Sequence, residues 1–110
     1  RRVVSACAAK TVCTVLERVA TSEGTARRAA VEGVKVAGKT GTAQRVVNKK
    51  YAEGLFRASF AGFFPANEPK YVIVSTFETK KSEGLSMHQG GQRPALTFAE
   101  IVKEIECGRK

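Results

Sequence analysis

The sequence contains no tryptophan and no aspartate, and its only histidine is His88. A self-contained Ser-His-Asp triad is therefore excluded, and we interpret His88 as a loop residue. The three cysteines, Cys7, Cys13 and Cys107, are too few and too irregularly spaced for a disulfide framework or a zinc site. We predict no metal and no cofactor.

The sequence also lacks a run of about 18 apolar residues, so nothing in it predicts a membrane-spanning helix. Acidic residues are scarce, and the formal net charge is +9. The basic residues form scattered doublets without interleaved aromatics, which argues against a single-strand nucleic-acid surface, and we expect no nucleic-acid partner. The chain opens on Arg1 and not on methionine, so we expect a segment of a longer protein, with any targeting signal upstream.

Hydrophobic periodicity predicts two helices in a chain long enough for one small domain. Apolar residues recur at steps of three and four from Val3 to Ala20, and a second helical pattern starts at Pro94 with Phe98 on its apolar face. Between them, Thr25 is a candidate N-cap for a short helix over residues 26–30.

Three stretches between the helices have the composition of β-strands. The last two are separated by a short turn at residues 65–69, so they should pair as an antiparallel hairpin. Two polar stretches, residues 45–54 and 79–93, are predicted loops. The predicted strands are Val34–Gln44, Leu55–Phe64 and Tyr71–Phe77.

The first of these strands carries the residues that could bind a ligand or take part in catalysis. They lie in the segment Ala37-Gly38-Lys39-Thr40-Gly41-Thr42-Ala43-Gln44. A lysine flanked by glycines beside two threonines offers an ammonium group, two hydroxyls and exposed backbone N–H groups to a carboxylate or a developing oxyanion. The alternative is structural: Lys39 as a surface lysine, the threonines as ordinary strand residues, and Gly38 and Gly41 as a β-bulge.

The order of motifs resembles the end of the class B penicillin-binding protein transpeptidase domain, across nearly the whole chain. A Lys-Thr-Gly motif belongs to the signature of penicillin-binding proteins. Ala43-Gln44 after Thr42, and Ser59-Phe60 in place of Trp-Phe, favour class B. The other matching segments are Gly24-Thr25-Ala26, Ala58–Ala66 and Gly90-Gly91, which stands before the terminal helix.

The resemblance implies an α+β fold of the α/β sandwich type, with an antiparallel three-stranded meander flanked by N- and C-terminal helices, as in serine β-lactamases. It implies catalytic roles for Lys39 and Thr42, and substrate binding by Thr40, Gly41 and Thr42. Lys39 would supply positive charge near the substrate carboxylate. The two threonine hydroxyls would bind that carboxylate, and the Thr42 N–H would be one of two oxyanion-hole donors. A Cβ at Gly41 would crowd the acyl group.

We interpret residues 1–110 as one C-terminal segment of a transpeptidase domain, without a second domain. The resemblance also implies what the rest of that domain contains. The family's Ser-x-x-Lys nucleophile motif and Ser-x-Asn motif are not in this chain. The expected partners are D-Ala-D-Ala stem peptides, β-lactams and the N-terminal part of the same domain. The protein is expected at the periplasmic face of the inner membrane, held there by an upstream anchor.

We expect the segment alone to be inactive and to self-associate through its open apolar area. Two alternatives from other functional classes stay open. The chain could be a non-catalytic module that binds D-Ala-terminated peptides, or a basic module that binds nucleic acid or another anionic polymer through its charge.

Overall fold

The computed structural model describes residues 1–21, 23–80 and 93–108. Its elements follow the predicted order of helix, three antiparallel strands and helix, and the fold class is α+β as expected. Most of the predicted loop at 79–93, with His88 and the Gly90-Gly91 pair, lies outside the described residues. The elements are α1 (Ala6–Val19), the 3-10 helix η1 (Arg27–Ala29), β1 (Ala37–Val47), β2 (Lys50–Phe64), β3 (Tyr71–Lys80) and α2 (Arg93–Gly108).

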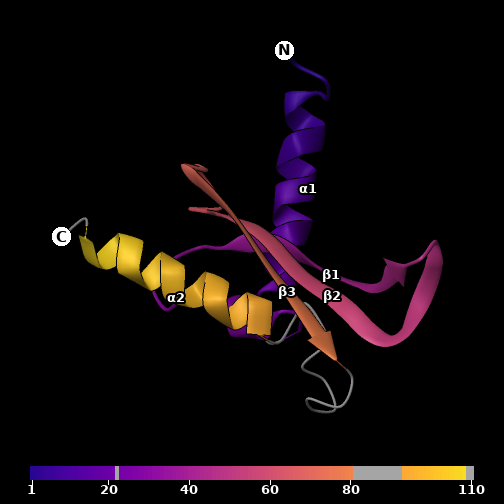
Figure 1. Ribbon diagram of the computed structural model, residues 1–110. Coiled ribbons are helices and arrows are strands. Elements are labelled where there is room, and N and C mark those ends of the chain that lie inside the picture. Colours follow the sequence, from indigo (N-terminus) through magenta and orange to yellow (C-terminus); the bar gives the residue numbers. More distant parts are fainter. Residues whose placement is uncertain (22, 81–92, 109–110) are drawn as a thin grey trace.

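Helix α1 begins at a side-chain cap and packs little of its surface. The Ser5 hydroxyl accepts a hydrogen bond from the Ala8 N–H at 3.0 Å, which satisfies one of the first unpaired amides of the helix. None of its residues is buried, and Val12 and Val15 are 53% and 59% exposed. Helix α1 projects from the rest of the chain (Figure 1), and much of the apolar stripe that predicted it is therefore exposed.

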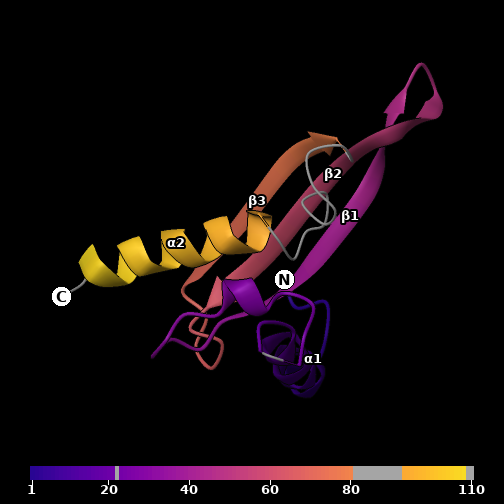
Figure 2. The same cartoon turned by 90° about the horizontal axis from the view of Figure 1, so that it is seen from below.

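The β1–β2 hairpin is longer and tighter than predicted. Asn48 and Lys49 have φ values of 52° and 65°, and Val47 pairs directly with Lys50. A two-residue turn with both φ values positive matches the twist of the flanking strands. The predicted loop at residues 45–54 is therefore wrong, because most of that stretch is strand. The tip of the hairpin projects away from both helices (Figures 1 and 2).

Strands β2 and β3 pair antiparallel from Leu55 opposite Lys80 to Phe64 opposite Tyr71, which confirms the predicted hairpin. The Lys70 N–H donates to Phe64 O at 3.0 Å and closes the turn between them. The sheet order is β1-β2-β3. Within the part of the chain that the structure describes, β1 is thus an edge strand.

The core lies between one sheet face and α2. Phe60 and Phe64 of β2 and Phe98 of α2 are fully buried, and the ring centroids of Phe60 and Phe98 are 4.9 Å apart in an edge-to-face arrangement. Such pairs add about 0.5–1.5 kcal/mol to the stability gained by burial. Val102 and the small residues Ala26 and Ala29 complete this core. Because the core anchors β2, it also fixes the register of β1 beside it.

Candidate functional site

The Lys-Thr-Gly segment lies on β1, as predicted. Its pairing with β2 runs without a shift from Ala37 to Gln44, and the register changes only between Gln44 and Val46. Neither Gly38 nor Gly41 therefore forms a β-bulge, which removes that part of the structural alternative. Side chains alternate along a strand, so Thr40 and Thr42 share one sheet face while Lys39 and Gly41 share the other.

The two glycines of the segment have different surroundings. Gly38 is buried, and a Cβ there would overlap the ring of Phe60 and lie 2.6 Å from Ala61 O. Gly38 is therefore required for the close approach of β1 to the core. A Cβ at Gly41 would meet nothing within 4 Å, because that position is open. Space for a ligand exists at Gly41 and not at Gly38.

The ammonium group of Lys39 contacts the next residue of the strand. Lys39 Nζ donates to Thr40 O at 3.1 Å and lies 3.4 Å from Thr40 Oγ1. The Lys39 side chain is exposed and Thr40 is half-buried. The cation is therefore held beside the hydroxyl of the next residue, although the two side chains leave opposite sheet faces. A positive charge and a hydroxyl so placed can bind one carboxylate.

A second hydroxyl reaches this point from the segment after α1. Thr25 Oγ1 lies 3.4 Å from Thr40 Oγ1, and either atom could be the donor. Its predicted role as an N-cap is wrong, because Ala26 precedes η1 and no side chain caps that helix. The Ala26 N–H instead donates to Val19 O at 2.9 Å, which folds the chain back onto the end of α1. This reversal turns the Thr25 side chain toward β1.

Glycine makes the reversal possible. A Cβ at Gly24 would overlap the carbonyl oxygens of Arg18 and Val19, so no larger residue fits there. The sequence signal for Thr25 was its place after this glycine, within the Gly24-Thr25-Ala26 match. Sequence reasoning used the match to recognise the family and did not assign Thr25 to the site.

An open pocket of 410 Å³ lies between the end of α1 and the start of β1. Lys39 of β1 and Thr25 line it, together with the Arg18–Glu23 ion pair, which measures 3.1 Å between Nη2 and Oε2. Its remaining lining residues are Val15, Val19 and Gly24. The pocket offers a cation, a hydroxyl and an apolar wall, which suits a short peptide end or a small amide.

Thr42 lies on the same strand two residues beyond Thr40, opposite Ala58, and its side chain is exposed. The structure thus brings Lys39, Thr40 and Thr25 together and places Gly41 and Thr42 next along the edge strand. Ser59, opposite Gly41, is engaged in a 3.3 Å contact between its hydroxyl and that of Thr76. Among the described residues, no cluster of His, Cys or Glu side chains is arranged to hold a metal ion.

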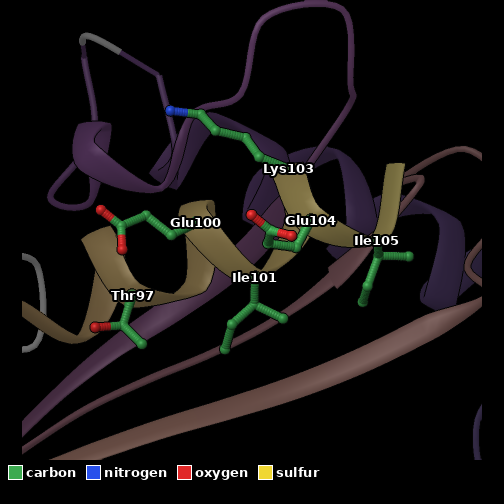
Figure 3. Close-up of a pocket in the computed structure, with 6 residues that line it drawn as sticks. All are labelled: Thr97, Glu100, Ile101, Lys103, Glu104 and Ile105. Carbon is green, nitrogen blue, oxygen red and sulfur yellow. The ribbon is translucent and has the colours of Figure 1, made fainter. Parts of the chain in front are cut away.

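A larger pocket, of 470 Å³, lies along α2 and includes none of the predicted site residues. Ile101 and Ile105 point to one side of the helix, while Lys103 extends away from them (Figure 3). All its lining residues belong to this one helix, so it is a surface depression between side chains. None of the helices that the structure describes is long and apolar enough to cross a membrane.

Comparison with known proteins identifies relatives over almost the whole chain. Residues 1–103 match the family described as the penicillin binding protein transpeptidase domain. The stage V sporulation protein D of Bacillus subtilis is 43% identical over 104 residues, which are 94% of this chain and 16% of that protein. A probable peptidoglycan D,D-transpeptidase, PenA of Neisseria flavescens, is 32% identical over 93% of this chain and 25% of its own length.

Solved structures agree with these relatives. The transpeptidase domain of penicillin-binding protein 3 from Burkholderia pseudomallei superposes on all of this chain with a TM-score of 0.84 and 34% identity, over 32% of that structure. Penicillin-binding protein 3 of Mycobacterium tuberculosis, solved with ampicillin, gives a TM-score of 0.76 and 32% identity over 96% of this chain and 25% of that structure. This chain, which spans a quarter or less of the two curated relatives, belongs to the class B penicillin-binding protein transpeptidase family.

Proposed function

We propose that residues 1–110 are the C-terminal segment of the transpeptidase domain of a longer protein, called the parent protein below. The parent protein cross-links peptidoglycan stem peptides by serine acyl transfer and is acylated by β-lactams. It works at the periplasmic face of the inner membrane, held by an anchor outside this chain. The observation that carries the proposal is the meeting of the Lys39 ammonium with the Thr40 and Thr25 hydroxyls beside an open pocket.

In the proposed reaction, a serine of another segment attacks the carbonyl carbon of the penultimate D-Ala of the donor peptide. The tetrahedral intermediate collapses, the terminal D-Ala leaves with a proton, and an amine of a second stem peptide then takes the acyl group from the serine. β-Lactams acylate the same serine through their strained amide. This chain supplies neither the nucleophile nor its Ser-x-x-Lys lysine.

The chain contributes recognition and charge stabilisation. Lys39 attracts the terminal carboxylate of the donor and supports the proton network of the catalytic serines, while the hydroxyls of Thr40 and Thr42 bind that carboxylate. The Thr42 N–H donates to the oxygen that becomes negative in the intermediate, and the N–H of the nucleophilic serine is the second donor. Each of these groups acts on charge that is present or develops in the transition state.

Two features of the structure support these assignments over a structural role for the segment. Among the described residues, the ion pairs involve Arg18, Arg45 and Arg57, and Lys39 has no carboxylate partner. The space over Gly41 is open, although the neighbouring Gly38 is closely packed. A strand with a purely structural role would require neither the exposed cation beside the Thr40 hydroxyl nor the open space at Gly41.

The test is the second-order rate of acylation of the parent protein by a fluorescent penicillin. Lys39→Gln should lower this rate by at least about tenfold, because it removes a charge from the carboxylate site. Lys70→Gln, in the exposed turn before β3, is the matched control and should leave the rate unchanged. Equal rates for the wild-type protein and Lys39→Gln would refute the assignment.

A further inference from the structure

The three strands bring a second group of charges together, farther toward the hairpin tip. Arg57 Nη2 of β2 lies 2.9 Å from Glu78 Oε1 of β3, and Arg45 Nε of β1 lies 3.6 Å from the same oxygen. Arg57 pairs in register with Glu78 on one side and with Ala43 on the other. Two guanidinium groups therefore share one carboxylate, and the group has a net positive charge.

The two arginines also line a pocket of 270 Å³ that Glu78 does not line. The other lining residues are Ala43, Gln44 and Val46, so the pocket combines two cations, an amide side chain and two small apolar walls. A guanidinium carries five N–H donors, and the recorded contacts with Glu78 use one from each arginine. The pair can therefore bind a second carboxylate while it keeps its contact with Glu78.

The direction of the bound peptide follows from the proposed function, on which this inference rests. If Lys39 and Thr40 bind the terminal carboxylate and the Thr42 N–H binds the scissile carbonyl, the acyl half of the donor continues toward Arg45. An extended peptide that lies along a sheet edge has the same rise per residue as the strand. Arg45 is three residues beyond Thr42, about 10 Å along the strand.

We propose that Arg45 and Arg57 bind a carboxylate that the acyl-donor peptide carries two or three residues before the cleaved bond. The site selects donors by charge, at a distance from the reacting atoms. Glu78 holds the two guanidiniums in place and offsets part of their positive charge. The arginines are therefore substrate-binding residues that determine specificity, and they take no part in bond making or breaking.

The experiment compares two donor peptides ending in D-Ala-D-Ala that differ only in a carboxylate or a carboxamide at the predicted position. The rate of D-Ala release by the parent protein gives kcat/KM for each. The wild-type protein should prefer the carboxylate donor by about tenfold, a factor typical of one charge-assisted contact. Arg57→Gln should lower kcat/KM for the carboxylate donor to the level of the carboxamide donor, through a higher KM. Arg28→Gln, an exposed arginine of η1, is the matched control and should keep it.

A second variant separates binding from a structural role. Glu78→Gln removes the negative charge that offsets the two arginines, so it should raise the preference for the carboxylate donor several-fold. If the arginines merely stabilise the hairpin, Glu78→Gln and Arg57→Gln should instead lower the rates on both donors alike, which would overturn the inference. Penicillin acylation, measured in parallel, separates the two proposals: a wild-type parent protein without acylation refutes the proposed function, whereas normal acylation without donor preference refutes this subsite alone.

Discussion

The hydroxyl oxygens of Thr25 and Thr40 lie 3.4 Å apart, although fifteen positions separate the two residues in the chain. The contact joins the turn after α1 to the edge strand that carries Lys39. It brings a second hydroxyl to the Thr40 Oγ1 atom that Lys39 Nζ also contacts. Two segments of the chain therefore contribute polar groups to one site, before any other part of a transpeptidase domain is considered.

Thr25→Val should weaken recognition of the donor without unfolding the protein. The exchange keeps the shape of the side chain and removes one hydroxyl, and such contacts contribute about 0.5–1.5 kcal/mol, or roughly a 2- to 10-fold change. We expect that loss in kcat/KM for D-Ala release by the parent protein. Thr25→Ser, which keeps the hydroxyl, should retain most of the rate, and a rate for Thr25→Val equal to wild type would exclude Thr25 from the site.

Alanine substitutions should separate the two glycines of the motif. Gly38→Ala forces a methyl group against the Phe60 ring and Ala61 O, and overpacking of this kind costs about 1–3 kcal/mol. Gly41→Ala enters open space and should leave the thermal unfolding midpoint of the 110-residue chain nearly unchanged. It should nevertheless slow acylation of the parent protein, since the methyl group then occupies space meant for the acyl group. Equal loss of stability in both variants would contradict the packing described for Gly38.

Acid should loosen the outer part of the sheet. The hydrogen bond from Arg57, followed by the charge of Arg45, holds the pKa of the Glu78 carboxyl below its usual 4.5. A carboxyl whose pKa is lower in the folded state stabilises that state above its unfolded pKa, and this contribution is lost as the pH falls through the lower folded value. Between pH 7 and pH 5, the protection of the β3 amides near Glu78, measured relative to their intrinsic exchange rate, should stay constant.

Below about pH 4.5, the protection of these amides relative to the intrinsic exchange rate should fall in the wild-type chain. Glu78→Gln is the control, because its exchange should not respond to acid in this range beyond the intrinsic rate. Acid-induced loosening of the same size in Glu78→Gln would mean that another group is responsible. The carboxyl is exposed on the sheet surface, so the effect should stay local.

The chain studied alone should self-associate. Val72 and Val74 of β3 are 74% and 66% exposed on the sheet face opposite the core, and the apolar stripe of α1 is exposed as well. Sedimentation should show an average mass that rises with concentration above that of the monomer. The double variant Val72→Lys, Val74→Lys should reduce this rise, whereas Asn67→Lys, in an exposed turn, should not. A monomer at every concentration would refute the prediction.

The elements predicted well from the sequence are those in which buried apolar residues recur at regular intervals on the face that packs against the core. The pattern around Phe98 predicted α2 because Phe98 and Val102 are buried on one side of it. The apolar alternation of β2 is similarly explained by Phe60 and Phe64, whose rings face α2. Burial of one face produces a periodic signal that a single sequence displays.

The features that sequence analysis missed have no such signal. The outer β1–β2 hairpin extends beyond both helices and turns at Asn48 and Lys49 with no glycine to mark a tight turn. Thr25 precedes a short helix, where a threonine usually caps, but its contact with Thr40 depends on how two distant segments pack. The Arg45–Glu78–Arg57 group likewise exists only through strand register. Local pattern therefore predicted the elements and the motif strand, and tertiary contacts determined the rest of the site.

The most direct test of the account uses fluorescent penicillin on the 110-residue chain and on the parent protein, side by side. We expect one labelled species for the parent protein and none for the isolated chain, because the chain holds the Lys39 strand without the serine that is acylated. Lys39→Gln should weaken labelling of the parent protein. A labelled band from the chain alone, at its mass of 11.8 kDa, or a parent protein that takes no label, would contradict it.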